Sequence, residues 1–84
     1  MAIDAREAAI KAKEYLQSLD VHTDPRTIQL EEVELSEDGM YWLITLSYIS
    51  KDTPFYLGLV REYKIFKIDL QSGNVQSMKI KQLK

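Results

Sequence analysis

The spacing of apolar residues near the amino terminus predicts one amphipathic helix, from Asp4 to about Leu19. Apolar side chains recur there at intervals of three and four residues and form a single stripe along the helix. The stripe consists of Ala5, Ala8, Ala9, Ala12, Leu16 and Leu19. Asp4 is a favourable N-cap, and Glu7 follows it at the spacing of a capping box. Because small alanine side chains dominate the stripe, we expect the helix to lie close to the surface that it covers. Ile10 lies off the stripe and is a candidate for an exposed contact.

After a connector that contains Pro25, the pattern changes to the period of two that is typical of β-strands. The predicted strands are Ile28 to Leu35, Met40 to Ser50, Val60 to Leu70 and Val75 to about Gln82. In the first strand the alternation slips at Glu31 and Glu32, and a β-bulge there would return the apolar side chains to one face. In the second strand the even-numbered side chains are the larger set, so we expect them to face the helix.

The segment from Tyr63 to Ile80 is the clearest hairpin, with a turn at Gln71-Ser72-Gly73-Asn74. Tyr63 and Ile65 have the opposite parity to Phe66, which leaves two alternatives: a second bulge, or two side chains that face outward. Ser36 to Gly39 predicts another turn. The sequence therefore predicts a single α+β domain over residues 1–84, in which one amino-terminal helix packs on a curled four-stranded antiparallel β-meander.

Composition narrows the classes of protein to consider. The net charge of −2 argues against a general nucleic-acid binder, and the absence of cysteine excludes disulfides and thiolate metal sites. The amino terminus carries charges where a signal peptide needs an apolar core, and the apolar run from Met40 to Ile49 is too short to span a membrane. We therefore expect a protein of the cytoplasm that is not attached to a membrane.

The chain offers little catalytic chemistry. Its single histidine, His22, lies in the connector, where a solvated loop residue is the better interpretation. Glu31, Glu32 and Glu34 are best explained as a solvated strand face that discourages edge pairing. No glycine-rich phosphate loop is present. The sequence predicts no enzyme, no catalytic residue, no metal site and no cofactor.

Charge is divided between two parts of the chain. Residues 28–40 contain five acids and no base, whereas residues 61–84 contain six bases and two acids. In a meander these two segments would lie at opposite edges of the sheet. One interpretation is solubility and edge protection; the other is a surface for self-association or for an acidic partner. Binding of nucleic acid through the basic face is a further, weaker alternative.

The last hairpin resembles a known family. Tyr63-Lys64-Ile65-Phe66-Lys67-Ile68-Asp69 followed by Ser72-Gly73-Asn74-Val75 is similar to the strand-turn-strand of PepSY-type domains. The alanine-rich helix and Trp42 also resemble theirs, and the whole order resembles the cystatin-like arrangement. The Gln-x-Val-x-Gly loop of cystatin inhibitors is missing. The resemblance implies a non-catalytic inhibitory or regulatory domain and transfers no site residue.

The sequence thus favours a non-catalytic module that acts through protein contacts, either with itself or with an unknown partner. The predicted interface combines a loop with the outer face of the sheet. Its residues are Phe55, Tyr56 and Leu57 in the loop, and Tyr41, Leu43 and Tyr63 on the sheet. The alternative for the loop is that Phe55 and Leu57 cap the core. The alternative for the function is a small-ligand binder or enzyme with a pocket between helix and sheet.

Overall fold

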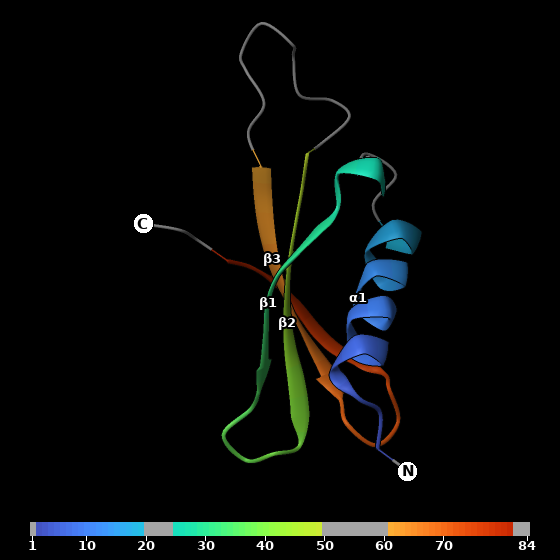
Figure 1. Cartoon of the computed structure of the whole chain (residues 1–84), viewed down its shortest axis with the longest axis vertical. Coiled ribbons are helices and arrows are strands. Elements are labelled where there is room, and N and C mark those ends of the chain that lie inside the picture. Colours follow the sequence, from blue (N-terminus) through green and yellow to red (C-terminus); the bar gives the residue numbers. More distant parts are fainter. Residues whose placement is uncertain (1, 20–24, 50–60, 82–84) are drawn as a thin grey trace, which may run out of the picture.

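In the part of the chain that the structure describes, one α-helix is followed by a four-stranded antiparallel sheet (Figure 1). The computed structural model describes residues 2–19, 25–49 and 61–81. The elements are helix α1 (Ala5–Leu19), the short 3-10 helix η1 (Pro25–Thr27), and strands β1 (Gln29–Leu35), β2 (Tyr41–Ile49), β3 (Arg61–Asp69) and β4 (Val75–Ile80). The α+β class and the order of elements are confirmed.

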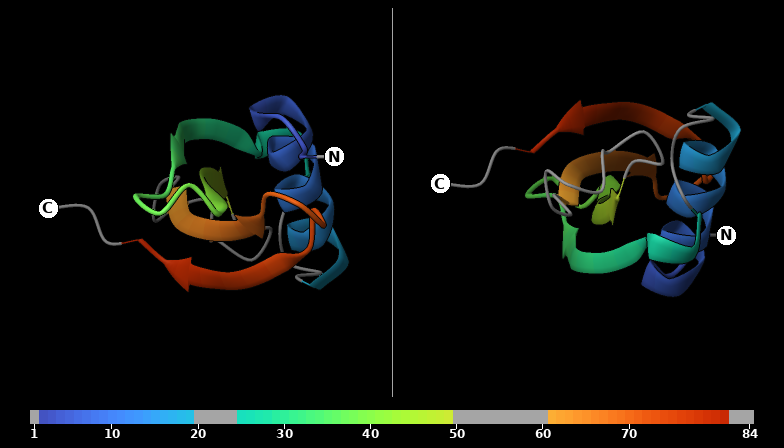
Figure 2. Two further views of the ribbon diagram at one scale, coloured as in Figure 1. Left: turned by 90° about the horizontal axis from the view of Figure 1, so that it is seen from below. Right: turned by 90° about the horizontal axis from the view of Figure 1, so that it is seen from above.

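Each strand pairs with its neighbour in the sequence, so the order across the sheet is β1-β2-β3-β4. Figure 2 shows the sheet curving so that β1 and β4 flank β2 and β3, with α1 along one side. Both β1 and β4 begin close to α1 and end away from it (Figure 2). The two edge strands therefore border the helix, one on each side of it.

The predicted β-bulge is present in β1. The ladder with β2 shifts between Leu30 and Glu32, which makes Glu31 the extra residue. Before the shift, Leu30 lies opposite a core-facing residue of β2, and after it Val33 and Leu35 do the same. All three apolar side chains of β1 consequently point to the side of the sheet on which α1 lies.

The ladder between β2 and β3 decides between the two alternatives for Tyr63 and Ile65. Its register is continuous from Arg61 to Asp69, so these two side chains face away from α1. The second irregularity lies in the β3–β4 ladder, where the register shifts between Lys67 and Ile68.

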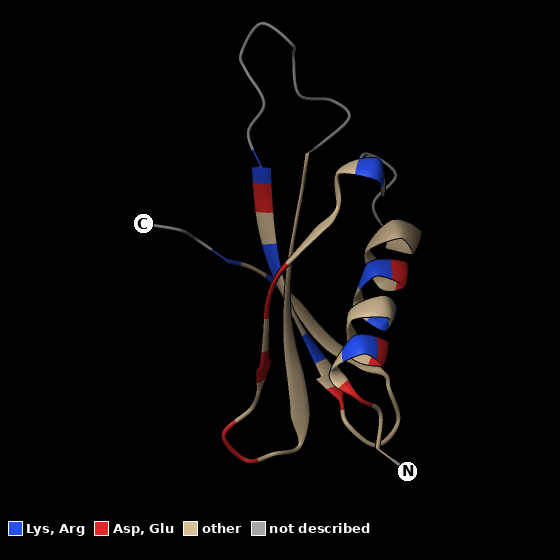
Figure 3. Cartoon of the chain, in the orientation of Figure 1, with Lys and Arg blue, Asp and Glu red and all other residues tan. Residues whose placement is uncertain are grey.

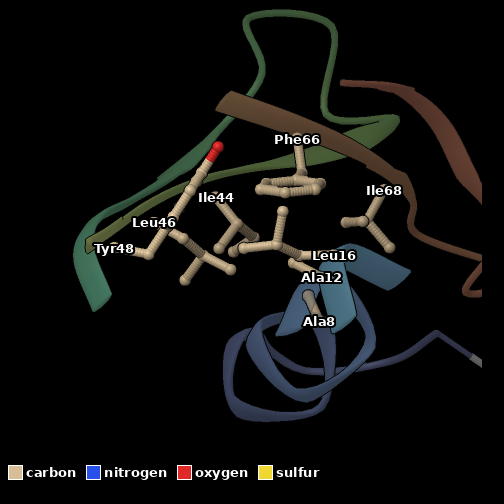
Figure 4. Packing of buried hydrophobic residues seen from close by; sticks show 8 residues of the cluster. All are labelled: Ala8, Ala12, Leu16, Ile44, Leu46, Tyr48, Phe66 and Ile68. Carbon is tan, nitrogen blue, oxygen red and sulfur yellow. The ribbon is translucent and has the colours of Figure 1, made fainter. Parts of the chain in front are cut away.

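Fully buried apolar side chains fill the space between α1 and the sheet (Figure 4). The cluster consists of Ala8, Ala12, Leu16, Ile44, Leu46, Tyr48, Phe66 and Ile68. The even-numbered side chains of β2 therefore face the helix, as predicted. Two residues that the sequence pattern predicts to face the core are exposed instead: Leu19 of the helix stripe is 55% exposed, and Met40 of the inward set is 56% exposed. Leu19 ends α1, and Met40 belongs to the turn before β2, so neither lies over the core.

Local hydrogen bonds fix the ends of the elements. The Asp4 carboxylate accepts a hydrogen bond from the backbone N–H of Glu7 at 2.8 Å, which confirms the predicted N-cap. Gly39 and Gly73 have φ values of 72° and 77°, the left-handed conformation that their turns require. No helix in the described ranges is both long and apolar enough to cross a membrane.

The segment before α1 is tied to both hairpins. The Ile3 N–H donates to the Leu70 carbonyl at 2.9 Å, and the Trp42 indole N–H donates to the Ile3 carbonyl at 3.0 Å. These bonds tie the segment just before α1 to β2 and to the turn after β3.

Candidate functional site

Strand β1 exposes more apolar surface than a solvated edge strand needs. All seven of its residues are exposed. On the side facing α1, the exposed fractions are 52% for Leu30, 40% for Val33 and 48% for Leu35. Because these side chains point toward the helix but are not covered by it, the edge of the sheet beside α1 is open and apolar.

A groove of about 440 Å³ lies between α1 and β1, and it is open to solvent. Its floor is apolar, and two basic side chains of α1 stand at its rim. The lining residues are Ala5, Arg6, Ala9, Ile10, Lys13, Ile28, Leu30, Val33 and Leu46. Ile10, which the sequence singles out as an exposed contact, is 49% exposed and lines this groove. We call this set of residues the α1–β1 groove.

The small side chains of α1 explain why the groove exists. The buried line of the helix, Ala8, Ala12 and Leu16, packs on the core of the sheet. Ala5 and Ala9 lie on the flank toward β1, where a methyl group is too short to fill the space to the strand. A larger residue at either position would narrow the groove.

Most of the side chains that line the described part of the groove are apolar. Among the lining residues that the structure describes, Arg6 and Lys13 alone carry charge, and none is a carboxylate, histidine or hydroxyl residue. No group of three or more acidic, histidine or cysteine side chains that could hold a metal is found in the described ranges. The described side chains of the groove can therefore bury apolar groups of a ligand and attract an anionic group.

The face of the sheet away from α1 has a different character, because polar contacts occupy its middle. Ser47 is completely buried there; its hydroxyl donates to the Glu31 carboxylate at 2.6 Å and accepts from the Arg61 Nε at 2.9 Å. Thr45 is 2% exposed, and its hydroxyl lies 3.5 Å from the Glu32 carboxylate. The β1 bulge brings both glutamates to this face.

Two basic residues join distant parts of the chain on this face. The Arg61 guanidinium donates to the carbonyls of Thr27 and Ser47, which links η1, β2 and β3. Lys81, just after β4, forms an ion pair with Glu32 of β1. Acidic and basic residues do lie at opposite edges of the sheet, as predicted, and Figure 3 shows the red positions along β1. The curvature of the sheet lets one such pair meet within a single molecule.

The sequence-predicted interface is divided between described and undescribed residues. Tyr41, Leu43 and Tyr63 are half-buried, and the β-ladder places them on the face away from α1. The ammonium group of Lys67 lies 4.2 Å from the centre of the Tyr41 ring. Phe55, Tyr56 and Leu57 lie outside the described residues. Their role as an interface or as a cap stays a prediction.

Two aspartates have a lowered pKa, and both serve hairpin turns. A hydrogen bond from the Ser36 hydroxyl and another from the Met40 N–H lower the pKa of Asp38. The backbone N–H groups of Ser72 and Gln71 lower the pKa of Asp69. Neither aspartate lines the α1–β1 groove. These shifts therefore reflect the hydrogen bonding within the two turns.

The sequence pattern indicates several features that form the groove, but it does not indicate that they lie together. It predicted the alanine stripe, the exposed Ile10 and the bulge that aligns the apolar side chains of β1. The sequence pattern does not connect Arg6 or Lys13 with this site, and it predicts a solvated face for the glutamates of β1. The sequence feature that could have indicated a groove is the combination of an alanine flank on the helix with apolar side chains on the edge strand.

Comparisons with protein-family models, with curated proteins and with solved structures give no match for this chain. The resemblance to PepSY-type domains and the cytoplasmic location accordingly stay predictions.

Proposed function

We propose that this domain is a non-catalytic protein-binding module that receives an apolar segment of a partner in the α1–β1 groove. The observation that carries the proposal is the exposure of Leu30, Val33 and Ile10 around one apolar groove. Apolar side chains that gather at a concave site are the usual anchor points for a protein partner.

The shape of the groove favours a polypeptide over a small molecule. Small-ligand sites bury most of the surface of the ligand, whereas this groove is open to solvent and ends at the free edge of β1. Apolar side chains with 0–2% exposure fill the core between α1 and the sheet. They leave little space in this core for an enclosed ligand.

A second candidate function uses the same groove. Arg6 and Lys13 at its rim favour a small amphipathic ligand with an anionic head group and an apolar tail. This candidate predicts that a medium-chain fatty acid perturbs the groove residues, and that replacing both bases by glutamine removes the effect.

Site-specific crosslinking tests the proposed function. A photoreactive amino acid replaces Ile10 in one variant and Leu19 in a matched control, since both side chains are exposed on α1 and only Ile10 lines the groove. The proposal predicts a discrete crosslinked protein from cells with the probe at Ile10, and its loss when Leu30→Glu is added. Equal products from both positions, or none, would contradict the proposal.

A further inference from the structure

We propose that β1 accepts an extended segment of a partner protein as an added strand, and that this segment alternates apolar with basic residues. This inference rests on the proposed function of the α1–β1 groove and specifies how its partner binds.

The position of β1 makes strand addition possible. β1 is hydrogen-bonded to β2 on one side only, and within the described residues no strand pairs with its other edge. A strand added there would place every second side chain over the groove beside α1. Main-chain hydrogen bonds would then supply affinity, and the groove would supply specificity.

The two faces of β1 set the chemistry of the added strand. On the side facing α1, Leu30 and Val33 present apolar surface, and Ile10 of the helix faces the same groove. On the other side, Glu32 and Glu34 present carboxylates. Side chains at neighbouring positions on one sheet face interact directly. Apolar residues are therefore favoured toward α1, and lysine or arginine on the opposite face.

The carboxylates also restrict which strands can bind. Glu32 is paired with Lys81, whereas no ion pair is seen for Glu34 within the described ranges. An acidic strand, or the β1 strand of a second copy, would bring carboxylates together at this edge. The bulge at Glu31 interrupts the regular edge, so pairing is confined to a short stretch that ends at Leu35.

Strand β4 of a second copy shares part of this chemistry, since Lys79 and Lys81 alternate with Met78 and Ile80. Such a β1–β4 contact joins two different surfaces and generates an open chain of molecules unless it closes into a ring. We therefore assign the groove to a separate partner, and self-association is a distinct outcome of the test.

The test measures binding of a labelled, end-capped peptide, Lys-Val-Lys-Ile-Lys-Val, by fluorescence anisotropy at low salt. The wild-type protein is expected to bind it. Methylation of alternate peptide nitrogens, which removes one hydrogen-bonding edge, should weaken binding by at least about tenfold. Glu34→Lys should weaken binding by about fivefold, and a peptide with glutamate in place of lysine should restore it. Glu37→Lys in the turn is the matched control for charge and should have little effect.

The outcomes separate this inference from the proposed function. If methylated and parent peptides bind equally and Ile10→Glu weakens both, the groove binds apolar segments without strand pairing, and the inference is wrong while the function stands. If no peptide binds and the Ile10 probe captures nothing, both are wrong. Sedimentation of the protein alone tests for a second copy as the occupant. If the protein is oligomeric, if Glu34→Lys dissociates the oligomer, and if adding Lys79→Glu restores it, a second copy occupies the groove. The assignment to a separate partner is then overturned.

Discussion

At the scale of single residues, Ser47 shows how this small domain satisfies a polar group inside it. The hydroxyl is fully buried on the sheet face away from α1, and it is bonded to both Glu31 and Arg61. A buried polar group needs such partners because its lost contacts with water must be replaced. The sequence places Ser47 on the outer parity of β2 but cannot predict its burial. That burial depends on the bulge, which turns Glu31 toward it.

Replacing Ser47 by alanine is expected to lower the free energy of unfolding by about 1–3 kcal/mol, because Glu31 and Arg61 both lose a buried partner. Urea denaturation measures the loss. Ser77→Ala on β4 is the matched control and should change stability much less, since Ser77 is only half-buried. Equal effects of the two substitutions would show that the Ser47 contacts contribute nothing specific.

The lowered pKa of Asp69 predicts a dependence of stability on pH. Its pKa in the folded chain is below the ordinary value of 3.8, because two backbone N–H groups of the β3–β4 turn bind the ionised carboxylate. The stabilisation is therefore complete above the ordinary value and is lost as the pH falls through the lower, folded-state pKa.

Asp69→Asn tests this dependence directly. The variant is expected to be less stable than the wild type at neutral pH, and the difference should shrink as the pH falls to about 2. Urea midpoints across this range provide the measurement. A difference that stays constant with pH would mean that the charge of Asp69 has no part in stabilising the turn.

At the scale of elements, the bulge in β1 and the alanine face of α1 together create the groove. The parity slip at Glu31 and Glu32 was sufficient to predict the bulge, because only an extra residue keeps Leu30 and Val33 on one face. The width of the space between α1 and β1 could not be predicted, since a periodic pattern shows which residues face inward but not how far away the neighbouring strand lies.

Deleting Glu31 removes one hydrogen-bond partner of Ser47 but should leave the fold intact, because it removes the extra residue and keeps every apolar side chain of β1 on its present face. Deleting Glu34 instead turns Val33 and Leu35 to opposite faces and should destabilise the protein strongly. Thermal unfolding of the two variants gives the comparison. The prediction fails if the Glu31 deletion is the more damaging of the two.

Ala12→Leu tests how closely α1 lies on the sheet. Ala12 is fully buried, so a larger side chain must displace its neighbours, and we expect a loss of about 1–3 kcal/mol. Gln17→Leu, at an exposed position of the same helix, is the control. Denaturant unfolding of both variants provides the measurement, and a stable Ala12→Leu protein would contradict close packing.

At the scale of the whole molecule, the sheet has two unlike surfaces. The α1 side carries an open apolar groove at β1, whereas the opposite side carries polar contacts around Ser47 and Thr45 and the ion pair of Glu32 with Lys81. The sequence predicted the fold class, the strand order and the charged edges. It placed the candidate interface on the sheet face away from α1, because the alternation of side chains shows which residues point outward. The alternation does not show which of these outward residues form polar contacts with one another.

Chemical-shift mapping of isotope-labelled protein with the Lys-Val-Lys-Ile-Lys-Val peptide tests the central claim most directly. The proposed groove predicts that the largest amide shifts occur along β1 and from Arg6 to Lys13 of α1. The claim would be contradicted if the largest amide shifts occurred at Tyr41, Leu43 and Tyr63 while those of β1 and α1 did not change. The interface would then lie on the sheet face away from α1.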